Sequence, residues 1–117
     1  LKLMAEERNQ ERVGEAWQMH RNGNNAGAIE IFEDIIRSYP EDLDALYGLG
    51  LARRSNGNDT GATDAFSKAL TITKERLAEL DGGKDVTQNL LDSEEDDRLL
   101  MLRRMISQRL EEIEARS

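Results

Sequence analysis

One seven-residue phrase occurs twice in this sequence, 34 residues apart. The first copy covers residues 22–28 (NGNNAGA), the second covers residues 56–62 (NGNDTGA), and five of the seven positions are identical. A period of 34 residues is typical of stacked helix-turn-helix units. The sequence therefore predicts a repeat array, an architecture that offers a recognition surface more often than an enzymatic cleft.

Each copy of the phrase marks the turn between two helices. Gly23 and Gly57 stand where a helix ends in a left-handed residue. The pairs Asn24-Asn25 and Asn58-Asp59 then supply side-chain oxygens that cap the next helix. We expect a first repeat over residues 9–42, a second over 43–80, a polar linker over 81–92 and a terminal helix over 93–116. The expected helices cover residues 5–21, 26–38, 43–55, 60–80 and 93–115.

The repeat extends to apolar positions outside the turn phrase. Small residues correspond at Ala16 and Gly50, while Phe32 corresponds to Phe66 with the same offset. Small side chains let two helices approach closely, and the phenylalanine rings would fill the space beside them.

The C-terminal segment has a broad apolar stripe. Leu99, Leu102, Ile106, Leu110 and Ile113 recur at three- and four-residue steps, as on one face of a helix. Leu100, Met101 and Met105 widen this stripe beyond what one neighbouring helix requires. A symmetric homodimer that buries the surplus is therefore one open hypothesis.

Composition excludes several classes of function. There is no cysteine, so disulfides and thiolate metal sites are absent, and the single histidine has no second imidazole beside it in a metal or catalytic motif. The acidic residues 92–97 lack the glycine and the final glutamate of a calcium loop. A net charge of −8 argues against a nucleic-acid surface, and no apolar run approaches the roughly 20 residues of a membrane span. We expect a cytoplasmic, non-enzymatic chain without metal or cofactor.

The repeated residues resemble the tetratricopeptide repeat family over residues 9–70. The first repeat departs from the family pattern at Arg12 and Glu15, where apolar residues are expected. A terminal repeat with a polar outer face explains this departure. The matching residues are Ala16, Gly23, Ala28, Phe32, Pro40, Leu46, Leu49, Gly50, Gly57, Ala62, Phe66 and Ala69.

This resemblance implies an all-α fold: five helices in a right-handed array, made of two repeats and a capping helix. It also implies that the first helices line a concave groove for a peptide or a protein partner. Family members that clamp the carboxylate tails of chaperones carry lysine and asparagine where this chain has Val13, Trp17 and Gly48, so that use is not expected. The groove-facing positions are Gln10, Val13, Trp17, His20 and Arg21, then Asp44, Tyr47, Leu51, Arg54 and Ser55.

Two kinds of side chain would bind the partner. The predicted apolar anchors form two pairs, Val13 with Trp17 and Tyr47 with Leu51. The two residues of each pair lie four positions apart and therefore share one helix face. His20, Arg21 and Arg54 would adjust the charge at the rim, although cations at a helix C-terminus have a purely structural explanation too.

One alternative is that the chain covers its own aromatic residues, with either the C-terminal helix or residues 1–4 lying across the groove. The expected function is non-catalytic protein–protein interaction. A homodimeric assembly module and a regulatory domain of a larger protein remain alternatives.

Overall fold

The computed structural model describes residues 2–82 and 94–116, with side chains for residues 4–80 and 96–116. The described residues form five α-helices and no strand, which confirms the predicted all-α class. The helices are α1 (Lys2–Arg21), α2 (Asn25–Ser38), α3 (Leu43–Ser55), α4 (Asp59–Gly82) and α6 (Glu94–Arg116). The end of α4 continues two residues into the expected linker, and the rest of that linker lies outside the described residues.

The two turns have the predicted geometry. Gly23 and Gly57 have φ angles of 86° and 84°, the left-handed region that glycine adopts without a Cβ clash. Asn24 Oδ1 accepts a hydrogen bond from the Gly27 backbone N–H at 3.0 Å, and Asn58 Oδ1 accepts one from Gly61 at 2.9 Å. Each asparagine therefore caps the helix that follows.

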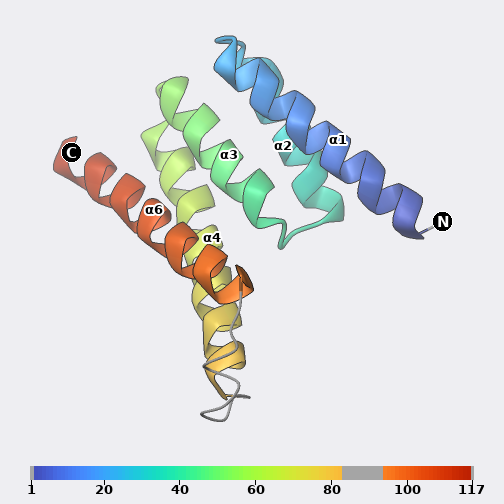
Figure 1. Cartoon of the computed structure of the whole chain (residues 1–117). Coiled ribbons are helices and arrows are strands. Elements are labelled where there is room, and N and C mark those ends of the chain that lie inside the picture. Colours follow the sequence, from blue (N-terminus) through green and yellow to red (C-terminus); the bar gives the residue numbers. More distant parts are fainter. Residues whose placement is uncertain (1, 83–93, 117) are drawn as a thin grey trace.

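Consecutive helices are neighbours in space. The main contacts join α1 to α2, α2 to α3, α3 to α4 and α4 to α6. In Figure 1, α1 and α6 lie toward the viewer, α2 and α4 lie behind them, and α3 lies between α1 and α6. Helix α6 therefore occupies the position that the first helix of a third repeat would take.

The predicted close approach of helices is confirmed around the two phenylalanines. Both rings are completely buried. A Cβ atom added to Gly50 would lie only 2.4 Å from Phe66 Cε1, and one added to Gly48 would lie 2.3 Å from Phe32 Cζ. Glycine at these positions lets α3 pack against α4 on one side and against α2 on the other.

Ion pairs add to the apolar packing of α6. Leu99, Ile106 and Ile113 are buried in a core cluster that α6 shares with α3 and α4. Arg54 of α3 lies 2.7 Å from the carboxylate of Glu112, and Arg116 lies 3.0 Å from that of Asp59 at the start of α4.

The N-terminal residues bear on the self-covering alternative. Residues 2–4 continue α1 as a helix, and Met4 is exposed. Cover by this segment is therefore wrong for the residues described. None of the described helices combines the length and apolar character that crossing a membrane requires.

Candidate functional site: a concave groove between α1, α3 and α6

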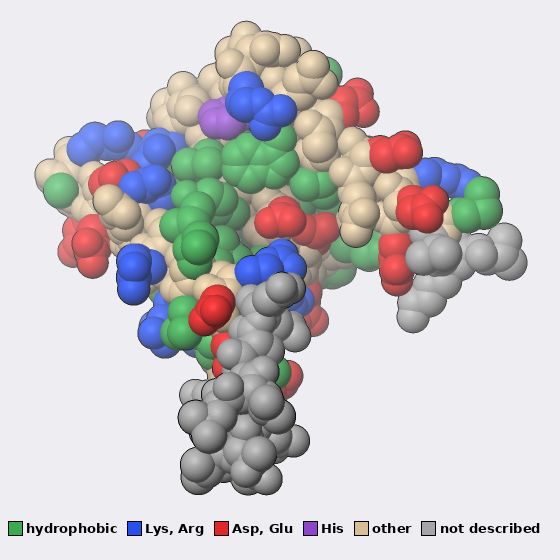
Figure 2. Space-filling view, viewed as in Figure 1, with side chains coloured by type: hydrophobic (Ala, Val, Ile, Leu, Met, Phe, Trp, Pro, Cys, Tyr) green, Lys and Arg blue, Asp and Glu red, His purple; other side chains and the backbone are tan. Residues whose placement is uncertain are grey.

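An open groove of about 1130 Å³ lies on the concave side of the helix array. Its walls come from α1, α3 and α6, and residues 38–42 close one end. Figure 2 shows an apolar area in the middle of this face, with basic side chains above and below it and acidic ones beside it. The apolar lining consists of Val13, Trp17, Leu43, Tyr47, Leu99, Met101, Leu102 and Met105, together with Tyr39 and Pro40.

The structure brings some of the predicted residues together in this groove and leaves others out. Predicted residues that line the groove are Gln10, Val13, Trp17, Arg21, Asp44 and Tyr47. His20, Leu51, Arg54 and Ser55 are not among the lining residues.

The predicted residues that do not line the groove are engaged in different contacts elsewhere. His20 Nδ1 lies 2.8 Å from Asn25 Oδ1, and its ring packs edge-on beside Trp17 with 6.1 Å between ring centroids. Leu51 is half-buried against the core cluster shared by α3, α4 and α6. The guanidinium of Arg54 is bound to Glu112, so it serves to attach α6.

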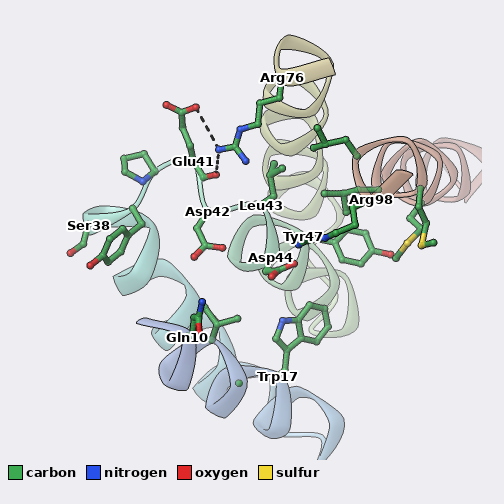
Figure 3. Close-up of a pocket in the computed structure, with 18 of the residues that line it drawn as sticks. Gln10, Trp17, Ser38, Glu41, Asp42, Leu43, Asp44, Tyr47, Arg76 and Arg98 are labelled. Carbon is green, nitrogen blue, oxygen red and sulfur yellow. Dashed lines mark hydrogen bonds and ion pairs between the residues drawn. The ribbon is translucent and has the colours of Figure 1, made fainter. Parts of the chain in front are cut away.

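Tyr47 belongs to the core more than to the surface. Its side chain is only 7% exposed, and its ring centroid lies 5.7 Å from that of Phe66 and 6.3 Å from that of Trp17. Figure 3 shows Tyr47 on the floor of the groove, pointing from α3 toward α6. Tyr47 thus offers little surface to a partner, and its burial in the cluster that includes residues of α6 agrees with the self-covering alternative for this residue.

Trp17 has a different environment. It is half-buried, with its ring edge-on to Phe32 at 5.7 Å between centroids, and it contacts both core clusters. Part of the indole remains at the groove wall (Figure 3). Trp17 therefore stays available as an anchor.

The residues that α6 contributes to the groove were not among the predicted partner-binding residues. Arg98, Met101, Leu102 and Met105 line the groove, and Met101 is 62% exposed. The signal was present as the surplus width of the α6 stripe. The structure divides that stripe between the core, which takes Leu99, Ile106 and Ile113, and the groove, which takes the methionines.

Most acidic groups of the groove already have partners. Arg76 Nη2 donates to the Glu41 carbonyl at 2.9 Å and lies 3.9 Å from its carboxylate (Figure 3). Asp42 Oδ1 accepts from the backbone N–H of Ala45 at the start of α3, and Asp42 Oδ2 accepts from Asn9. Among the described residues, Arg21, Arg98 and Asp44 make no ion pair.

One carboxylate of α6 joins this helix to α3. Glu112 binds Arg54 at 2.7 Å and Arg109 Nε at 2.9 Å. Burial alone would raise the pKa of Glu112, but the hydrogen bonds and charges of these two arginines outweigh it and lower the pKa. Burial would likewise lower the pKa of Arg109, but Glu112 and Tyr47 raise it above its ordinary value. The groove wall is thus fixed to α3 by a charged contact.

No cluster of three or more His, Cys, Asp or Glu side chains that could hold a metal ion occurs among the described residues. The described lining of the groove consists of apolar side chains with charged residues at its margins. Such an arrangement is suited to recognition.

Comparison with known families agrees with this geometry. Residues 21–76 match the family model of the tetratricopeptide repeat, from the end of α1 through most of α4. The unmatched part of α1 includes Arg12, which departs from the family pattern and forms an ion pair with Asp34 of α2. Searches of curated proteins and of solved structures gave no significant match. Residues 21–76 of this chain are therefore similar to tetratricopeptide repeats, modules that typically mediate protein–protein interaction.

Proposed function

We propose that this protein binds a segment of a partner protein in the concave groove between α1, α3 and α6. The observation that carries this proposal is the exposure of Met101, at 62%, on the wall of an apolar hollow of about 1130 Å³.

The walls of the groove suit this role. Met101 and Met105 lie four residues apart on α6, so they lie on one face and reach the groove together. Methionine side chains adapt to irregular apolar partners because they are unbranched and polarisable. Trp17 faces them from α1 as a larger and more rigid anchor. Since the anchors are carried by packed helices, the cost of ordering on binding falls mainly on the partner.

Charge introduced into the groove tests the proposal. Met101→Glu places a carboxylate among the apolar lining, and we expect it to abolish the capture of partners that the wild-type protein retains from a cell lysate. Leu100→Glu is the matched control, because Leu100 is the adjacent residue of α6, is 42% exposed and does not line the groove. Captured proteins would be identified by mass spectrometry, and circular dichroism would verify that both variants keep their helicity.

The two variants must differ for the proposal to stand. If Met101→Glu captures the same proteins as Leu100→Glu, binding takes place elsewhere. Tyr47 is unsuitable for this test because its buried ring supports the core. The homodimer and the regulatory-domain alternatives remain untested predictions, and sedimentation of the same samples would reveal self-association.

A further inference from the structure

We propose that the occupant of the groove is an amphipathic α-helix of a partner protein, with an apolar face and acidic side chains toward both ends of that face. This inference rests on the proposed function of the groove. It adds the conformation and the charge of the segment that binds there.

The composition of the walls favours a helix over an extended segment. All three walls are helices whose backbone hydrogen bonds are internal, so the described groove offers no strand edge for pairing. Gln10 is the one carboxamide side chain among the lining residues. An extended peptide would leave without partners those of its backbone N–H and C=O groups that face the apolar part of the lining. A helix satisfies these groups internally and presents only its side chains.

The size of the groove agrees with a short helix. Three helices form the walls of the groove, and a helix with its side chains is about 10 Å in diameter, so the axes of the outer two lie at least roughly 20 Å apart. A helix rises 1.5 Å per residue, so about 13 residues span this distance. Arg21 at the end of α1 and Arg98 near the start of α6 would then lie toward opposite ends of the bound helix.

The unpaired charged side chains of the groove determine which charge the partner segment should carry. Glu41 and Asp42 are engaged with Arg76, Asn9 and the start of α3, whereas Arg21 and Arg98 make no ion pair among the described residues. Asp44 is also unpaired, but it lies in the first turn of α3, where the helix dipole stabilises a carboxylate. Two guanidinium groups therefore remain for acidic side chains of the partner.

The net charge of −8 does not oppose this assignment at close range. At physiological ionic strength, charges more than about 8 Å apart are largely screened, so the two arginines at the groove act more strongly than the distant carboxylates. Exposed ion pairs contribute modestly, and two of them together correspond to about a tenfold preference in affinity.

A pair of synthetic helical peptides tests the proposal. Both are 16 residues long with the same leucine face, and one carries Glu near both ends while the other carries Lys. Neither contains tryptophan, so Trp17, the only tryptophan of the chain, reports binding from within the groove through its fluorescence. We expect the Glu peptide to bind about tenfold more tightly, and a version with a central proline to lose binding because proline breaks the helix.

Charge reversal separates local from overall electrostatics. The double variant Arg21→Glu/Arg98→Glu should reverse the preference, so that the Lys peptide binds more tightly. Arg103→Glu/Arg104→Glu is the matched control, because these exposed residues of α6 lie outside the groove and the change in net charge is the same. This control should keep the preference for Glu.

Each outcome bears on a distinct claim. Equal affinity for both peptides, or reversal by the control variant, overturns the acidic partner but leaves binding in the groove intact. Unchanged binding of the proline peptide overturns the helical occupant. Trp17 fluorescence that responds to neither peptide overturns this inference and also counts against the proposed groove.

Discussion

The contact between Gly50 and Phe66 gives a prediction whose magnitude follows from the structure. A Cβ atom at residue 50 would lie 2.4, 2.5 and 2.7 Å from three carbons of the Phe66 ring. Carbon atoms pack best at about 3.5–4.0 Å, so the ring or the helix must move by roughly 1 Å. Phe66 has no exposed surface and packs against Tyr47, which leaves it no free direction.

We therefore expect Gly50→Ala to destabilise the protein although alanine is the better helix former. Overpacking of a core costs about 1–3 kcal/mol, and the gain in helix propensity offsets about 1 kcal/mol of this. A net loss of up to about 2 kcal/mol lowers the melting temperature of a chain of this size by as much as roughly 8 °C. Thermal unfolding followed by circular dichroism at 222 nm measures it.

Gly14→Ala is the matched control for this substitution. Gly14 lies within α1, and an added Cβ atom would have no neighbour within 4 Å. Only the propensity gain applies there, so the melting temperature should rise by about 2–4 °C. Phe66→Leu combined with Gly50→Ala should lose less stability than the two single variants added together, because the smaller side chain relieves the clash. A Gly50→Ala variant as stable as Gly14→Ala would refute the close approach of α3 and α4.

Three further predictions concern the turns and the attachment of α6. Gly57→Ala should cost about 1–2 kcal/mol in chemical denaturation, since φ is 84° at this residue and alanine is strained there. Asn58→Ala removes the cap of α4 and should cost about 1 kcal/mol in the same measurement, and a variant as stable as the wild type would contradict the cap. The lowered pKa of Glu112 means that its ion pairs stabilise the fold above the ordinary pKa of 4.5, and that this contribution is lost as the pH falls through the lowered value. Acidification below pH 4.5 should therefore lower the melting temperature of the wild type more steeply than that of Glu112→Gln.

The sequence predicted the repeat fold well because its signals are local. The turn geometry depends on only a few adjacent residues. The repeated seven-residue phrase therefore predicts both the positive φ angles of Gly23 and Gly57 and the helix caps at Asn24 and Asn58. The contact of Phe66 with Gly50 follows from the 34-residue offset, which requires the same packing twice. The contact of Phe32 with Gly48 could not be derived in this way, because it joins one repeat to the next.

The candidate site was predicted less completely because it depends on where α6 packs. No third turn phrase fixes the register of α6, and its stripe alone does not show which side chains face α4 and which face the groove. As a result Met101 and Met105 were assigned to a dimer surface, and Tyr47 was expected to face solvent although α6 covers it.

Arg54 shows most clearly why charge at the groove could not be derived from spacing. The family resemblance placed Arg54 at the rim of the groove, yet its guanidinium donates to Glu112, 58 residues along the chain, at 2.7 Å. Arg98 shows the reverse case. It was not predicted as a binding residue from the sequence, yet it lines the groove and makes no ion pair among the described residues. The charge that a partner meets is therefore determined by which arginines α6 uses for its own attachment. Glu112→Gln should consequently weaken the hold of α3 on α6, one wall of the groove, because it removes the charge that binds the Arg54 guanidinium.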